Sequence, residues 1–285
     1  MMKFWMRNHS RDLPKLQEGI YHLSGSYSKL ELMNFIAQGP ELSHTKLTFL
    51  EGWSIYDIDQ YLTKNNFFNA GVYLQKVQDQ QFIEKMRSEF SFLALLPEGK
   101  SLEGFLYPDT YFLDQQGASV EKVIKMQLEN FDNKVWKKYR DQFITFTPQG
   151  LDLTNYRALI LASVIENEEK NQTNKPLIAG IFINRLFAGM RLDADVTLCY
   201  GLKLPYSQCR DAIPSNLSDA TNLYNTRQNI GLMPTPISSP SIATLDALFN
   251  YQKTDALFYL HDNQGKIYYG VTLEEHNQNK LKYLK

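Results

Sequence analysis

The sequence is poor in cysteine, in net charge and in long apolar runs, and these absences exclude several kinds of protein. Its formal net charge is −1 and no sustained Lys/Arg patch is present, which argues against nucleic acid as the main partner. No stretch approaches the ~20 apolar residues that a membrane-spanning helix needs. The first six residues, Met1–Met6, are too short and too interrupted for a signal peptide.

The few cysteines and histidines also argue against a metal centre. The five His are scattered without H-x-x-x-H spacing, and the two Cys lack an adjacent His pair, so a zinc site is not expected. Cys199 and Cys209 are close enough in sequence for a disulfide in an oxidising compartment, and two free thiols in a reducing one fit equally well.

Motifs of several common enzyme classes are missing as well. The sequence has no G-x-S-x-G elbow, which leaves Ser/His/Asp hydrolysis unsupported. It also has no P-loop and no G-x-G-x-x-G fingerprint for nucleotides.

What is present is typical of a folded protein of one or two domains. The 285 residues are 43% hydrophobic and 21% charged, enough for a core of good size. Aromatic residues make up 13% of the chain. Such side chains line many sugar-binding surfaces, although ordinary cores use them too.

Local patterns predict both helices and strands, and therefore an α+β fold. Pro176 near the first turn and Gly189 just past the end delimit one helix, and Thr272-Leu273-Glu274-Glu275 is a capping box. The segment 202–240 is rich in proline and is predicted to be mostly loop. The predicted strands are 19–23, 46–50, 105–113 (strand or extended loop), 258–260 and 267–269, and the predicted helices are 28–38, 53–62, 78–90, 120–143, 155–169 and 175–187.

The most informative stretch is Ala158–Lys170, ALILASVIENEEK, in which an apolar run ends in the carboxylate of Glu166. An acid at the edge of an apolar surface is expected to hold its proton near neutral pH, because desolvation raises its pKa and makes it a general acid. A surface ion pair with Lys170, four residues further on, is the alternative.

Several further blocks occur in a fixed order around this stretch. Together they resemble the endolytic murein transglycosylases, the MltG or YceG-like family, over about residues 95–285, with a looser match before that. Two departures are Val196 in the block D-P-T-x-x-Y-G and Met233 in G-L-P-P. The matching blocks are Glu103–Tyr111 (EGFLYPDTY), Ala162–Glu168, Phe182–Leu192, Asp195–Gly201, Tyr224–Pro234 and Thr272–Asn277.

The resemblance implies that Glu166 is the catalytic acid of a lytic transglycosylase. One Glu protonates the oxygen between N-acetylmuramic acid (MurNAc) and N-acetylglucosamine (GlcNAc), and then accepts the proton of the C6 hydroxyl as that oxygen attacks C1. The product is a 1,6-anhydroMurNAc end, and no water, metal or other cofactor is needed. Glu168 aligns with a second family acid, but two positions along a helix point it away from the Glu166 face. On this interpretation, Glu166→Gln is expected to keep the fold and lose activity.

The resemblance also implies a set of substrate-binding residues. Glu103 is the best second carboxylate, with a capping or turn role as the alternative. Arg185 is suited to a peptide-stem carboxylate or to a buried pair between helices, and Asn225 to an N-acetyl group. The full predicted set is Glu103, Asn184, Arg185, Asp195, Thr197, Tyr224 and Asn225.

The predicted organisation has two parts, with residues 1–95 as a LysM-like module with linking helices and 96–285 as the catalytic domain. The module is expected either to bind glycan or to act as a spacer. The resemblance also implies an N-terminal membrane anchor. This chain lacks one, which suggests a shortened chain or a misplaced start. The family implies a periplasmic place at the inner membrane through that anchor, peptidoglycan glycan strands as substrate and peptidoglycan synthases as partners.

Two rival functions stay open from the sequence. One is a hydrolase of the same polymer in which Asp193 or Asp195 activates water, and which leaves a reducing end instead of an anhydro end. The other is a glycan-binding scaffold without catalysis.

Overall fold

The computed structural model describes the chain except for residues 1–20, 22, 40–43, 115–118, 210 and 285. It divides into two compact units, one of residues 1–48 with 110–119 and one of residues 49–109 with 120–285. The predicted boundary near residue 95 falls inside the second unit and stays a prediction. Each unit has one two-stranded antiparallel sheet among its described residues, and helices make up most of the rest, so the α+β class is confirmed.

The first unit contains helix α2 (Lys29–Ala37) and strands β1 (His44–Thr48) and β2 (Thr110–Asp114). Ser28 and Glu31 form a capping box that starts α2. In the sheet, buried Leu47 lies opposite buried Tyr111. The predicted strand 105–113 therefore begins only at Thr110, and the predicted strand 19–23 lies mostly outside the described residues. A LysM-like fold is not apparent from these elements alone.

The second unit begins with short helices whose starts are set by side-chain caps. Ser54 and Asp57 form a capping box at α3 (Ile55–Lys64), and α3 packs on α4 (Val72–Gln78). The single helix predicted over 78–90 is α5 (Gln80–Glu89), which is separated from α4 by Asp79, whose carboxylate caps α5. The 3-10 helix η1 (Ser91–Leu95) follows.

The long helix predicted over 120–143 is present with one irregular turn. It consists of α6 (Val120–Phe131), a π-helical turn η3 (Asp132–Trp136) and α7 (Lys137–Thr145). A short 3-10 turn, η4 (Pro148–Gly150), comes before the next helix.

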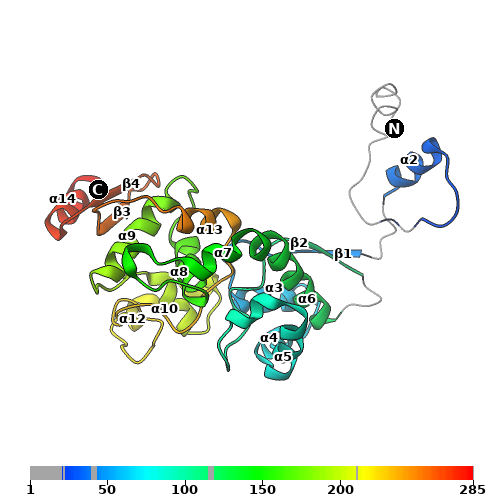
Figure 1. Ribbon diagram of the computed structural model, residues 1–285, viewed down its shortest axis with the longest axis horizontal. Helices are drawn as coiled ribbons and strands as arrows, with labels where there is room; N and C mark the ends of the chain where they lie inside the picture. Colours follow the sequence, from blue (N-terminus) through cyan, green and yellow to red (C-terminus); the bar gives the residue numbers. More distant parts are fainter. Residues whose placement is uncertain (1–20, 22, 40–43, 115–118, 210, 285) are drawn as a thin grey trace. The chain divides into compact units, whose positions relative to one another are not determined.

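The core around the candidate site is formed by three helices, α8 (Tyr156–Glu168), α9 (Lys175–Phe187) and α13 (Ile242–Phe249), which pack on one another (Figure 1). The bounds of α8 and α9 agree closely with the prediction. Gly180 lets the backbone after α13 approach α9, because a Cβ there would lie 2.1 Å from the carbonyl oxygen of Gln252. Neither α13 nor α10 (Asp195–Gly201) was predicted.

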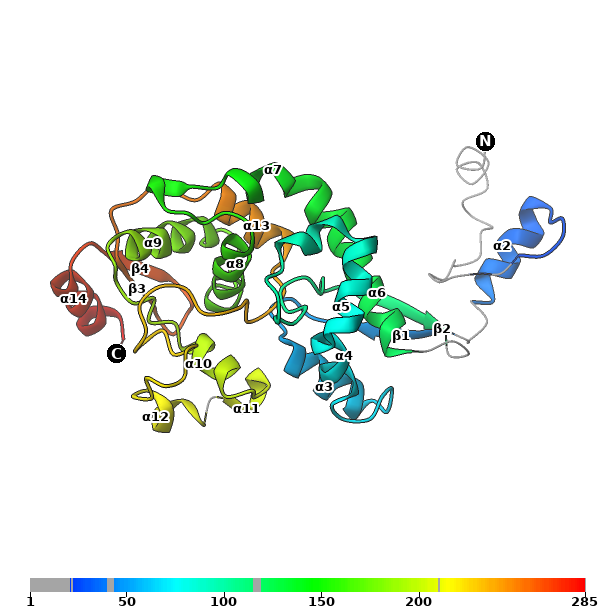
Figure 2. The same cartoon turned by 60° about the horizontal axis from the view of Figure 1, so that its bottom comes forward.

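The rest of the second unit is loop-rich, as predicted, and ends in a hairpin and a helix. Figure 2 shows α10, α11 (Tyr206–Cys209) and α12 (Ile213–Asn216) in succession, and a disulfide joins Cys199 of α10 to Cys209 of α11. Strands β3 (Phe258–His261) and β4 (Ile267–Gly270) form the predicted hairpin, and α14 (Leu273–Tyr283) packs on it after its capping box. Among the described helices, none has the length and apolar character to cross a membrane.

Candidate active site

Glu166, the predicted acid, is sealed in the core. Its side chain is 3% exposed, and its Oε1 accepts a hydrogen bond from Lys175 Nζ at 2.9 Å. Its Oε2 accepts from the Ser241 backbone N–H at 2.8 Å, the Ser241 hydroxyl at 2.7 Å and the Thr244 hydroxyl at 2.5 Å. Four donors therefore tie the end of α8 to the starts of α9 and α13.

This environment reverses the protonation expected for Glu166. Burial alone would raise its pKa, but the charge of Lys175 and the hydrogen bonds from Thr244, Lys175 and Ser241 outweigh it and hold the pKa below the usual value. The pKa of Glu166 is therefore lowered instead of raised, contrary to the expectation from sequence, while its assignment as the catalytic acid stays a prediction. A carboxylate held ionised by a buried ammonium is suited to bracing helices rather than to donating a proton.

Glu168, two residues further along α8, has the opposite character. It is half-buried and accepts a hydrogen bond from the Tyr259 hydroxyl at 2.8 Å. Desolvation raises the pKa of Glu168, and the nearby charge of Asp195 raises it further, while Tyr259, His261 and Arg185 pull the other way without cancelling the shift. A raised pKa favours the protonated form, which a general acid needs.

Charged side chains from other elements surround Glu168. Asp195, in the first turn of α10, forms a two-pronged pair with Arg227, in which Arg227 Nη2 lies 3.1 Å from Asp195 Oδ2. His261 Nε2 lies 2.9 Å from Glu169 Oε2. The site therefore combines the C-terminal end of α8, the start of α10 and the β3 strand.

Arg185 lies next to this cluster and packs on Tyr259. It is buried, and its guanidinium donates to the carbonyl oxygens of Leu257 and Leu192, both at 2.6 Å. It also lies over the ring of Tyr259 at 5.8 Å, the tyrosine that binds Glu168. Of the two roles predicted for Arg185, the buried tie between elements is the one observed, with backbone carbonyls as its main partners.

Four other predicted substrate-binding residues make hydrogen bonds to other parts of the chain. Asn184 donates to the carbonyl oxygens of Thr254 and Ala256, and Asn225 is fully buried and donates to three carbonyl oxygens of the loop 216–219. Thr197 is buried against Ala194 and Thr226. The Tyr224 hydroxyl bonds Thr235, and its ring lies 5.0 Å from that of Tyr200. Their predicted contacts with substrate stay untested.

Glu103 is a second buried carboxyl, away from Glu168. It is 1% exposed and accepts from the backbone N–H of Ile55 at 2.9 Å and of Gly104 at 3.3 Å. Ile55 begins α3, so Glu103 caps this helix from a distance. Desolvation raises the pKa of Glu103 to about 8 despite these bonds and one from Tyr200. The capping alternative is therefore observed, and direct contact with substrate stays a prediction.

Sequence reasoning missed the partners that decide these roles. Lys175, Ser241 and Thr244 carry no local motif, and Tyr259 and Arg227 lie far from α8 in sequence. The one available signal was the paired spacing of Glu166 and Glu168, since two positions on a helix differ by about 200° and cannot share an environment.

A model described as the YceG-like family matches residues 1–282. The chain belongs to the YceG-like family. The resemblance inferred from the ordered blocks is thereby confirmed.

Two curated relatives of this YceG-like chain carry the same name. It is 30% identical over 290 residues to an endolytic murein transglycosylase of Streptococcus pneumoniae serotype 2 (strain D39), an alignment that covers 94% of this chain and 51% of the relative. It is 26% identical over 273 residues to an endolytic murein transglycosylase of Bacillus subtilis (strain 168), with 94% and 73% covered. The chain thus spans about half the length of the pneumococcal relative.

A solved structure supports the fold. The chain is similar to a yceG-like protein of Listeria monocytogenes with a TM-score of 0.70 and 28% identity, over 97% of this chain and 89% of that one. The fold of this chain is thus similar to one already seen in an experimental structure.

Proposed function

We propose that this chain is an endolytic lytic transglycosylase of peptidoglycan. It cuts the bond between MurNAc and GlcNAc inside glycan strands and leaves a 1,6-anhydroMurNAc end. The names of the pneumococcal and Bacillus relatives support the reaction class. The observation that carries the proposal is Glu168, a half-buried carboxyl of raised pKa held by Tyr259 beside Asp195, Arg185 and His261.

In the proposed reaction Glu168 acts first as an acid and then as a base. Its carboxyl gives a proton to the bridging oxygen, so that the bond from this oxygen to C1 breaks and the GlcNAc side leaves with a hydroxyl. Positive charge develops at C1, and the ionised Glu168 then accepts the proton of the C6 hydroxyl as that oxygen bonds to C1. Atoms balance without water, and one carboxyl of raised pKa serves both steps.

Glu168 fits this role better than Glu166. An acid must be protonated before the first step, and the ion pair with Lys175 lowers the pKa of Glu166. The four donors around Glu166 would also have to be broken before it could reach a sugar. Glu168 has one hydrogen-bond donor, Tyr259, and is partly accessible. We propose that Glu166 positions the end of α8 on which Glu168 is carried.

The test is a comparison of products from wild type, Glu168→Gln and Glu166→Gln on purified sacculi, analysed by mass. Anhydro ends from the wild type and none from folded Glu168→Gln support the proposal. Reducing ends would support the rival hydrolase. That rival is weakened by the engagement of Asp195 with Arg227, which leaves this carboxylate poorly placed to activate water.

Location, partners and the N-terminal module follow from the family by proposal only. We propose that the enzyme works on the outer face of the plasma membrane, beside the synthases that make the strands. The LysM-like interpretation of the N-terminal part is retained in the same sense, supported by the order α2, β1, α3 along the chain. Pull-down of the first 95 residues on glycan, compared with the second part, tests that module.

A further inference from the structure

A groove with no assigned role runs beside α3. One cavity, of about 390 Å³, lies between the turn 50–53, α3 and the last turn of α8. A second cavity, of about 650 Å³, also lies along α3 and shares Gln60, Lys64 and Ser207 with the first, so the two adjoin. Both volumes fall in the range of about 300–1,000 Å³ that holds small ligands.

Aromatic rings form one wall of this groove, which we call the α3 groove. Trp53 and Tyr61 both line it, with ring centroids 5.4 Å apart and planes tilted by 52°. Phe49 supports Tyr61 edge-on at 5.9 Å. The faces of such rings carry partial negative charge and attract the weakly positive C–H face of a pyranose ring.

Two polar groups in the groove lack partners. In the part of the chain that the structure describes, neither the Gln60 carboxamide nor the Trp53 indole N–H makes a hydrogen bond, although both side chains are half-buried. A donor or acceptor withdrawn from water without a partner is costly. Hydroxyl or acetamido groups of a sugar would supply the missing bonds.

The charges around the groove balance. Glu51 and Asp57 are acidic, while Lys64 and Lys170 are basic, and all four line the same cavity. A site for an anionic polymer would need an excess of positive charge, and this groove has none. The lining therefore fits an uncharged sugar ring.

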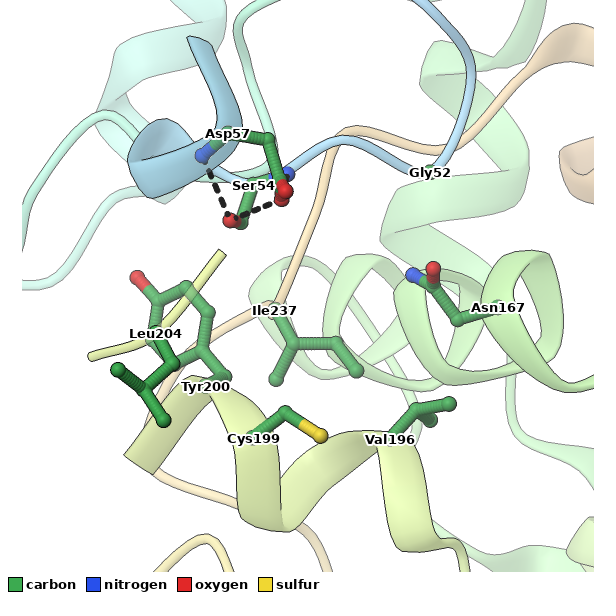
Figure 3. A pocket seen from close by; sticks show the side chains of 9 residues that line it. All are labelled: Gly52, Ser54, Asp57, Asn167, Val196, Cys199, Tyr200, Leu204 and Ile237. Carbon is green, nitrogen blue, oxygen red and sulfur yellow. Dashed lines mark hydrogen bonds between the residues drawn. The ribbon is translucent and has the colours of Figure 1, made fainter. Parts of the chain in front are cut away.

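Asn167, on the last turn of α8, lines the groove. This residue lines both the 390 Å³ cavity and the adjoining hollow of Figure 3, in which its amide stands on α8 near Gly52. Bonds from its amide to Ser163 O at 3.1 Å and Ser238 Oγ at 2.8 Å fix it. Gly52 must remain glycine, since its φ is +78° and a Cβ would lie 3.0 Å from Asn167 Oδ1. Asn167 directly precedes Glu168 on α8, so the groove and the proposed acid share the last turn of this helix.

From these observations we infer that the α3 groove is a saccharide subsite. It holds an N-acetylated hexose residue of the glycan strand beyond the bond that is cut, with Trp53 stacked on the ring and Gln60 bonded to its polar substituents. The inference rests on the proposed function for its substrate class. It assigns to α3 a role in selecting long strands over short ones.

Binding without turnover tests it most cleanly. Trp53→Ala and Gln60→Ala are each made in the Glu168→Gln background, and affinity for soluble N-acetylglucosamine oligomers and for uncrosslinked glycan strands is measured by calorimetry. Trp53→Ala is expected to bind about tenfold more weakly, the loss of one stacked aromatic contact. Phe187→Ala is the matched control, because Phe187 is 61% exposed on α9 and lines a different cavity. Its affinity should not change.

Folding and the proposed function are controlled separately. Trp53→Phe should recover most of the affinity if stacking is the cause, and unchanged circular dichroism shows that the fold is kept. Equal affinity of wild type, Trp53→Ala and Gln60→Ala would overturn the subsite. If the wild type yields no anhydro ends while Trp53→Ala still weakens binding, the proposed reaction fails and the subsite stands. If anhydro ends form with the same KM for long strands in Trp53→Ala, the subsite fails and the reaction stands.

Discussion

Glu166 and Glu168 lie two residues apart on α8 and have opposite partners. Glu166 pairs with Lys175 at 2.9 Å in the core, and Glu168 accepts from Tyr259 at 2.8 Å in the charged cluster. The pKa of the first is lowered and that of the second is raised. One helix end thus carries a carboxyl of lowered pKa that ties helices together and a carboxyl of raised pKa.

Replacement of the proposed acid should remove activity and spare the fold. Glu168→Gln keeps the side-chain shape and an acceptor for Tyr259, but it has no proton to donate, so the rate of anhydro-end formation should fall by a factor of about 10²–10⁴. Steady-state release of muropeptides measures this. A folded Glu168→Gln protein that retains the wild-type rate would exclude residue 168 as the acid.

Replacement of Glu166 should mainly cost stability. Glu166→Gln leaves the ammonium of Lys175 buried without its counter-charge, and such a loss costs about 3–5 kcal/mol of unfolding free energy. This departs from the expectation from sequence that Glu166→Gln keeps the fold. Urea unfolding provides the measurement. Lys175→Met added to Glu166→Gln should recover part of the loss, because it removes the stranded charge, and no recovery would show that the pair is not the cause.

The alkaline limb of the activity profile should follow the environment of Glu168. The first step needs the protonated carboxyl, so activity declines as pH rises through the pKa of Glu168. Asp195→Asn removes a negative charge that raises this pKa, and the limb should therefore move to lower pH. The matched control is Asp211→Asn, because Asp211 is an exposed acidic residue in the turn after α11 and is not among the causes of this shift. If the alkaline limb of the activity profile stays at the same pH in Asp195→Asn, Asp195 does not influence the pKa of the acid.

Glu103 should make the fold less stable as pH rises. Its pKa is raised from 4.5 to about 8, so the folded state holds this proton more tightly than the unfolded chain does. Its contribution is complete below about 4.5 and is lost as pH rises to about 8, with a slope of up to about 1.4 kcal/mol per pH unit. Glu103→Gln, which keeps an acceptor for Ile55, should flatten this dependence. Unfolding free energies at several pH values measure it, and parallel slopes in wild type and variant would contradict the shift.

Local signals predicted much of the fold because their causes are local. The start of α9 at Lys175 and its end before Gly189 follow from proline and glycine preferences, and Thr272 caps α14 as its motif requires. Helix α13 was missed because its short apolar run lies just after the proline-rich loop. The pairing of β1 with β2 joins segments about 60 residues apart, which no local pattern specifies.

The site was predictable only in part, for a physical reason. Sequence placed the acid on the last turn of α8, but the choice between Glu166 and Glu168 depends on which face meets Lys175 and which meets Tyr259. Those contacts come from α9 and β3, and a pKa is set by such tertiary neighbours. Likewise, Glu103 is a residue of the type expected at a substrate site. Its carboxylate nevertheless accepts a hydrogen bond from the Ile55 N–H and caps α3, which is far from it in sequence.

The most direct test is mass analysis of muropeptides released from purified sacculi by three proteins. These are the wild type, Glu168→Gln, and the double variant of Glu166→Gln and Lys175→Met, in which part of the lost stability is expected to be recovered. We expect 1,6-anhydro ends from the wild type, none from Glu168→Gln, and some from the double variant in proportion to its folded fraction. Anhydro ends from Glu168→Gln and none from a folded double variant would contradict the assignment and return the acid to Glu166.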